Sequence, residues 1–382
     1  MCHFVEFQRH ASRICFYRCI GVITVDISSA RQTSRKLYLD ALRIIAIFAV
    51  VFNHTKTHGY AFFLNATESA FFPLYIFCSS FCKIAVPIFL MISGALLLKK
   101  EEPILVILKK RFLKFFIVLF LVSLIIHMYY LQWKFQEFSF ALFIQELYST
   151  GTTTSLWYLY AFLSYLLMLP FLRKLAKNMH GKDYLYLTGL MFFAALFQCL
   201  EFAVWDYSIH LHPNFELFSV SKIVFYPLIG DYLANKLDDN KVTGKHVFLL
   251  CAIGFLFTVV NCWLTCKWCE HLGEWNINTF ETFISQFIFV PAMAVFVLAR
   301  YLFSKIKLSS VIQKSIVHIG SCTFGIYLFE RIYRKETLFI FNALSAHIPD
   351  FLACIVWVFC VIIIGLVITS IIKKIPILRN LL

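Results

Sequence analysis

Long apolar stretches recur along the whole chain and are separated by short polar segments. A helix that crosses a bilayer needs about 20 mostly apolar residues. About ten stretches meet this requirement, so the pattern predicts an all-α fold, a polytopic bundle of transmembrane helices. The expected spans are residues 38–59, 75–98, 112–132, 156–172, 184–204, 217–235, 247–266, 280–302, 316–340 and 351–372.

The composition supports a membrane protein. Hydrophobic residues make up 60% of the 382 residues and charged residues only 15%, whereas soluble domains are about half apolar and a quarter charged. The net charge of +14 would suggest acidic partners in a soluble protein. Here the Lys and Arg residues gather in alternate loops, which sets the orientation of the spans. We therefore expect both termini in the cytoplasm and no nucleic-acid partner.

The sequence divides into three parts. Residues 1–36 are basic and moderately polar, and we expect them to form a disordered cytoplasmic leader. Residues 37–375 hold all the expected spans and form one membrane domain, and residues 376–382 form a cytoplasmic tail.

The first expected span contains ionisable residues. Arg43 and His54 are eleven residues apart, which places them on one face of a helix and about 16 Å apart along its axis. Asp40 lies one turn before Arg43 and is expected to hold its guanidinium group. Ionisable residues inside a span cost insertion energy, so they are functional candidates by default.

This arrangement, with an anion anchor and a base at its two ends, would fit a long donor such as an acyl coenzyme A, but the spacing alone does not identify a reaction. Arg43 can bind a phosphate or carboxylate through two parallel hydrogen bonds. His54 is a candidate general base, because the histidine side chain titrates near neutral pH. Two structural alternatives remain open: Arg43 extends to the inner interface, or His54 is a hydrogen-bonded polar residue near the outer interface.

Six segments together resemble the acyltransferase-3 family of integral membrane acyltransferases, and among its members the bacterial enzymes that O-acetylate surface polysaccharides. The first combines Asp40-Ala-Leu-Arg43 with His54. The others are Val86–Gly94, Lys109–Arg111, Leu156–Tyr160 with Pro170, Tyr226–Gly230 and Thr323–Leu328.

The resemblance implies an enzyme of the bacterial cytoplasmic membrane. It would move an acetyl or similar acyl group from cytoplasmic acyl-CoA to a hydroxyl of a cell-surface glycan or lipid-linked saccharide. Acetyl-CoA would be a cosubstrate, and neither a bound cofactor nor a metal is expected. The implied catalytic residues are His54, Arg43 and Asp40.

The substrate-binding residues are also expectations. Ser93 and Gly94 allow either close helix packing or close approach of a ligand to the backbone. Trp157 and Tyr158 either stack on a sugar or belong to an interfacial aromatic belt. The expected donor-binding residues are Arg43, Lys110, Arg111, Ser93 and Gly94. The expected acceptor-binding residues are Trp157, Tyr158, Lys83 and Glu330.

One position departs from the family pattern. Many relatives carry a histidine after the Gly-Ile-Tyr-Leu run, where this chain has Glu330 followed by Arg331. Three partners for Glu330 stay open, namely Arg331, Arg334 and Lys83. Lys222 is either an acceptor contact or a side chain that extends to the interface.

Other functions remain to be separated from acyl transfer. A transporter or flippase for a lipid-linked glycan would also carry intramembrane charges, and a sensing domain would require a soluble partner domain. Near the outer end of one span, Cys262, Cys266, Cys269 and His271 could bind zinc, form a Cys266–Cys269 disulfide or stay reduced.

Overall fold

The computed structural model describes residues 36–134, 137–149, 151, 154–205, 222–238 and 242–381. The chain divides into two compact units, Met1–Leu37 and Tyr38–Leu382. In the described residues the second unit consists of helices and loops without a strand, which confirms the all-α fold class. The expected leader lies outside the described residues, apart from Lys36.

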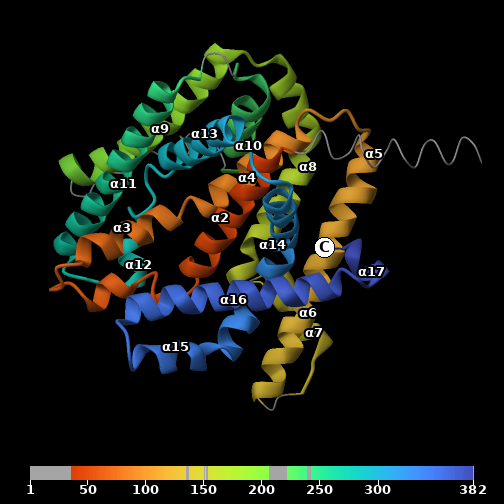
Figure 1. Cartoon of the computed structure of the whole chain (residues 1–382), viewed down its shortest axis with the longest axis vertical. Coiled ribbons are helices and arrows are strands. Elements are labelled where there is room, and N and C mark those ends of the chain that lie inside the picture. The colour runs from red at the N-terminus through yellow and green to blue at the C-terminus, as the bar shows by residue number, and fades with distance from the viewer. Residues whose placement is uncertain are drawn as a thin grey trace, which may run out of the picture. The chain divides into compact units, whose positions relative to one another are not determined.

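The helices follow one another with short connections (Figure 1). The first half contains α2 (Leu37–Asn53), η1 (Lys56–His58), η2 (Phe62–Asn65), α3 (Phe72–Cys82), α4 (Ala85–Leu97), α5 (Ile104–Val106), η3 (Ile107–Phe112), α6 (Leu113–Lys134), α7 (Phe140–Ser149), η4 (Thr154–Leu156), α8 (Trp157–Asn178) and α9 (Gly181–Trp205). The second half contains α10 (Lys222–Asp231), η6 (Tyr232–Lys236), α11 (Gly244–Leu272), α12 (Ile277–Phe280), α13 (Phe289–Lys305), α14 (Ser310–Glu336), α15 (Leu338–Ser345), α16 (Asp350–Ile372) and α17 (Pro376–Arg379).

Six helical segments in the described part of the chain are long and apolar enough to cross a membrane. The four remaining expected spans coincide with α2, α10, α13 and α14, which do not meet that criterion. The chain is thus a membrane protein with several spans, while the count of ten and the cytoplasmic termini stay predictions. The six segments are Phe72–Leu97, Ile104–Leu131, Trp157–Asn178, Gly181–Phe202, Gly244–Leu272 and Asp350–Ile372.

The second expected span is interrupted at Lys83 and Ile84, between α3 and α4. Pro87 has no N–H to donate to the carbonyl of Lys83, and its ring crowds that carbonyl. The N–H groups of Lys83 and Ile84 instead bond to carbonyls three residues earlier, both at 3.1 Å. The break leaves Lys83 beside the loop that follows α2, where its ammonium lies 4.6 Å from the centre of the Tyr60 ring.

Helices α4 and α10 touch through their backbones. A Cβ atom on Gly94 would lie 1.9 Å from the carbonyl oxygen of Pro227, and one on Gly230 would lie 2.1 Å from that of Met91. Small residues permit such close approach between membrane helices. The two alternatives for Gly94 are therefore resolved in favour of helix packing.

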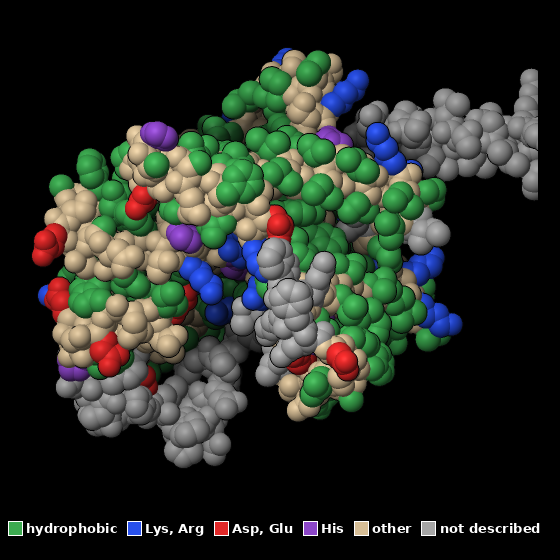
Figure 2. Space-filling view, turned by 90° about the horizontal axis from the view of Figure 1, so that it is seen from below, with side chains coloured by type: hydrophobic (Ala, Val, Ile, Leu, Met, Phe, Trp, Pro, Cys, Tyr) green, Lys and Arg blue, Asp and Glu red, His purple; other side chains and the backbone are tan. Residues whose placement is uncertain are grey.

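The surface is largely apolar, as expected in lipid. In the most apolar part of α9 only 11% of the residues are buried inside the protein, so most of its side chains face outward. Figure 2 shows hydrophobic side chains over much of one face, with Lys, Arg and His side chains gathered beside a hollow near its middle.

Candidate functional site

A cavity of about 650 Å³ lies among α2, α4, α8, α10 and α14. Its volume is in the range typical of small-molecule binding sites. The structure brings six of the expected site residues to its wall, and both ends of the first-helix motif are among them. These six are Arg43, His54, Lys83, Ser93, Trp157 and Tyr158.

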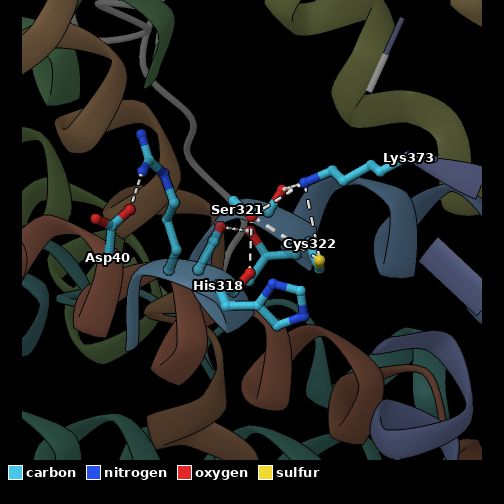
Figure 3. Close-up of polar contacts among 8 residues, drawn as sticks. Asp40, His318, Ser321, Cys322 and Lys373 are labelled. Carbon is cyan, nitrogen blue, oxygen red and sulfur yellow. Dashed lines mark hydrogen bonds and ion pairs between the residues drawn. The ribbon is translucent and has the colours of Figure 1, made fainter. Parts of the chain in front are cut away.

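We call the part of the cavity around Arg43, Ser93, Gly320 and Ser321 the Arg43 end. Arg43 Nη1 donates to Asp40 Oδ1 at 2.5 Å, as the sequence predicted (Figure 3). The side chain of Asp40 is only 1% exposed, whereas that of Arg43 is 25% exposed and faces the cavity. The buried carboxylate therefore positions a guanidinium group at the cavity wall.

Helix α14 makes room for Asp40 by means of a glycine. A Cβ atom on Gly320 would lie 2.7 Å from the Cβ of Asp40 and 3.1 Å from its carbonyl oxygen. Because Gly320 also lines the cavity, the same close contact joins α2 to α14 and shapes the Arg43 end.

A second network of polar side chains, from α14 and from the C-terminal end of α16, lies next to the Arg43 end. Lys373 donates to the carbonyl oxygen of Ser321 and, at 3.0 Å, to its hydroxyl. His318 Nε2 lies 3.0 Å from the hydroxyl of Ser370, and Figure 3 shows His318, Ser321, Cys322 and Lys373 close together. Ser321 lines the cavity, so the network reaches the Arg43 end through one hydroxyl.

We call the part of the cavity around Asn53, His54, Lys83, Lys222 and Glu281 the His54 end. His54 follows the last residue of α2, and its N–H still bonds to Val50 O at 3.1 Å. Its Nδ1 lies 2.8 Å from Glu330 Oε1 on α14. The His54 ring lines the cavity and is 22% exposed, so Nε2 is the nitrogen left for a ligand.

Glu330 lies behind His54 and is absent from the cavity wall. Its side chain is 0% exposed, and Arg334 Nε donates to its second carboxylate oxygen at 2.5 Å. Of the three expected partners of Glu330, Arg334 is thus confirmed. The contact between Glu330 and His54 was not predicted. Because a buried carboxylate on Nδ1 fixes the tautomer of an imidazole, Glu330 is placed to orient His54 and does not reach an acceptor in the cavity.

Lys83 pairs with a residue that the sequence had not singled out. Its ammonium lies 2.7 Å from both carboxylate oxygens of Glu281, and Tyr60 donates to Oε1 of the same carboxylate at 2.6 Å. Glu281 stands at the start of the expected span 280–302, so a search for an intramembrane acid to match Lys83 would have found it.

The aromatic residues Trp157 and Tyr158 occupy different environments. The Trp157 side chain is 49% exposed and borders the cavity. Tyr158 packs against Phe89 and Tyr327, with ring centres 6.0 Å apart in both cases. Trp157 is therefore accessible to a large ligand, whereas Tyr158 forms part of the packed wall.

Arg111 and Lys110 do not line the cavity. The Arg111 guanidinium donates to Glu102 through two bonds of 2.6 and 3.0 Å, and Arg173 donates to the same carboxylate at 2.8 Å. The hydrogen bonds from Arg111 hold the pKa of Glu102 at about 2, below its usual range. This network joins the loop before α5 to η3 and α8, while Lys110 is exposed.

The cysteines Cys262, Cys266 and Cys269 are free thiols, so the Cys266–Cys269 disulfide is not formed. No group of three or more potential metal ligands occurs among the residues that the structure describes.

The sequence of the chain also matches a known family of proteins. The family model for an acyltransferase domain, acyltransferase-3, matches residues 36–374. The chain belongs to the acyltransferase-3 family. It is therefore a membrane acyltransferase. No curated protein and no solved structure gives a significant match.

Proposed function

We propose that this acyltransferase moves an acetyl or similar acyl group from acyl-CoA to a hydroxyl of a cell-surface glycan or lipid-linked saccharide. The observation that carries the proposal is the pair of His54 and Glu330, joined at 2.8 Å, in the same cavity as Arg43. A carboxylate that orients an imidazole is a recurrent arrangement in acyl transfer. The expected location is the bacterial cytoplasmic membrane.

The donor fits the Arg43 end. Phosphate groups of coenzyme A are anionic and bind guanidinium groups through paired hydrogen bonds. Arg43 and His54 are separated by about 16 Å of helix, a distance that the extended arm of coenzyme A spans. We therefore place the phosphates near Arg43 and the thioester near His54.

The reaction proceeds by direct attack. The acceptor hydroxyl gives its proton to Nε2 of His54 while its oxygen bonds to the thioester carbonyl carbon. The carbon–sulfur bond breaks, the electron pair leaves with sulfur, and the proton on His54 passes to the thiolate. The products are an ester and free coenzyme A, and Glu330 balances the positive charge that His54 carries during the step.

A covalent acyl-histidine is the alternative route within the same cavity. The two routes differ in one measurement, the appearance of labelled protein when the enzyme is mixed with radiolabelled acetyl-CoA and no acceptor. Direct attack predicts no labelled His54, whereas the covalent route predicts labelling that is lost in His54→Ala.

Transfer of a labelled acetyl group distinguishes an acyltransferase from a flippase. Membrane vesicles with the protein receive acetyl-CoA labelled in the acetyl group together with membrane glycan, and vesicles with Arg43→Ala serve as the control. Ester-linked label on the glycan, absent in the control, is expected. Movement of the glycan across the bilayer without any labelled ester would contradict the proposal.

A further inference from the structure

The His54 end contains more positive than negative charge. Lys83, Lys222 and Glu281 all line this part of the cavity. Lys83 and Lys222 lie within electrostatic range of one another, and Lys83 is next to the loop after α2. The two lysines therefore belong to one region, and Glu281 is the carboxylate that faces it from the wall.

Glu281 is already committed to other groups. Both of its carboxylate oxygens contact the ammonium of Lys83 at 2.7 Å, and the Tyr60 hydroxyl adds a third hydrogen bond. Among the described residues, no carboxylate lies within 4.0 Å of Lys222. Within that part of the chain, one ammonium group at the cavity wall is therefore left without a counter-charge.

The side chain of Lys222 is exposed and lines the cavity, together with Tyr226 one turn later on α10. Its ammonium is therefore hydrated when the cavity holds only water, and it is accessible to a ligand. An anionic group in the cavity would satisfy it directly.

We propose that the acceptor which binds at the His54 end is an acidic saccharide, whose carboxylate or phosphate pairs with Lys222. Lys222 then determines specificity by selecting acidic over neutral acceptors. The inference rests on the proposed function for the location of the acceptor, but its charge requirement can be measured without any acyl transfer.

The test is equilibrium dialysis of the purified protein in nanodiscs of uncharged lipid. The three radiolabelled probes are methyl β-glucuronide, glucose 6-phosphate and methyl β-glucoside, and no donor is present. We expect at least one of the two anionic probes to bind about tenfold more tightly than the neutral glucoside, the effect of one charge-assisted contact. The comparison of the two anions distinguishes a carboxylate from a phosphate acceptor.

Lys222→Gln should abolish this difference, and Lys267→Gln should retain it, because Lys267 pairs with Glu270 outside the cavity. Glu281→Gln should tighten anion binding, since it releases Lys83, and a loss of folding would not produce that gain. Equal binding of charged and neutral probes overturns the proposal, as does selectivity that survives Lys222→Gln and disappears in Arg43→Gln. None of these results depends on acetyl transfer, which is assayed separately.

Discussion

The two ends of the cavity hold their charged groups in different ways. At the Arg43 end the guanidinium is positioned by Asp40, three residues earlier on the same helix. At the His54 end the imidazole is positioned by Glu330, 276 residues later in the chain. The first contact follows from helical geometry alone, whereas the second exists only when α2 and α14 have packed. The Arg43 end, which we propose binds the donor, is thus organised by local contacts, whereas the His54 end, which we propose holds the catalytic base, is organised by tertiary packing.

The largest effect is expected at the tertiary contact. Glu330→Gln keeps the shape of the side chain but removes the charge that orients His54 and balances the imidazolium. We expect kcat to fall by about 10²-fold or more with little change in the KM for acetyl-CoA. Steady-state acetyl transfer in vesicles measures both constants. A donor KM that rises while kcat stays constant would contradict the role of Glu330 at His54 and would assign it to donor binding.

A smaller effect is expected from the local contact. Arg43→Lys keeps the charge but loses paired hydrogen bonding, so the KM for acetyl-CoA should rise about tenfold and kcat should change less. An unchanged donor affinity, measured by dialysis with labelled coenzyme A, would remove Arg43 from the donor site.

The helix contact that buries Asp40 provides a third test. Gly320→Ala places a methyl group 2.7 Å from the Asp40 Cβ, and such overpacking costs about 1–3 kcal/mol. We expect a lower melting temperature and weaker donor binding. Gly189→Ala is the matched control, because a Cβ there meets nothing within 4 Å. If both variants melt alike, α2 and α14 are not packed as described.

The smallest effect concerns Arg111, which lies outside the cavity wall. Arg111→Gln should change the donor KM by less than about twofold, because it removes only an ion pair outside the cavity, and such pairs contribute little free energy.

The ion pairs of Glu102 provide a test of stability against pH. The folded-state pKa of Glu102 is about 2, below its unfolded-state value. The ion pairs of Glu102 therefore stabilise the fold above the unfolded-state pKa, and this stabilisation is lost as the pH falls toward 2.

A melting series from pH 6 to pH 3 tests that assignment. The wild-type protein should lose more of its thermal stability over this range than Glu102→Gln, which has no carboxylate to protonate. Parallel curves for the two proteins would mean that the network of Glu102, Arg111 and Arg173 does not stabilise the fold.

The sequence allowed the fold class and several spans to be predicted because apolar runs and helical periodicity are local properties. It also predicted the contact between Asp40 and Arg43. It did not predict the partners of His54 and Lys83, which come from α14 and from the loop before α13. Apolar patterning shows that an intramembrane charge needs a partner, but only helix packing decides which partner it meets.

The expected roles of Gly94, Arg111 and Glu330 show the same limit. Gly94 and Arg111 lie on segments that resemble the family, and Glu330 follows two residues after another such segment. Yet Gly94 is used in the crossing with α10, Arg111 binds Glu102, and Glu330 lies behind His54. A motif identifies which segments approach the site, whereas the side chains that face the cavity depend on the rotation and packing of each helix.

The most direct test of the account is acetyl transfer by His54→Ala in membrane vesicles that hold the same amount of protein as the wild type. Labelled acetyl-CoA supplies the acyl group and membrane glycan the acceptor, while dialysis with coenzyme A checks that the donor end is intact. If His54 is the general base, transfer should fall by about 10²-fold or more while donor binding is unchanged. Transfer at the wild-type rate would contradict this role of His54.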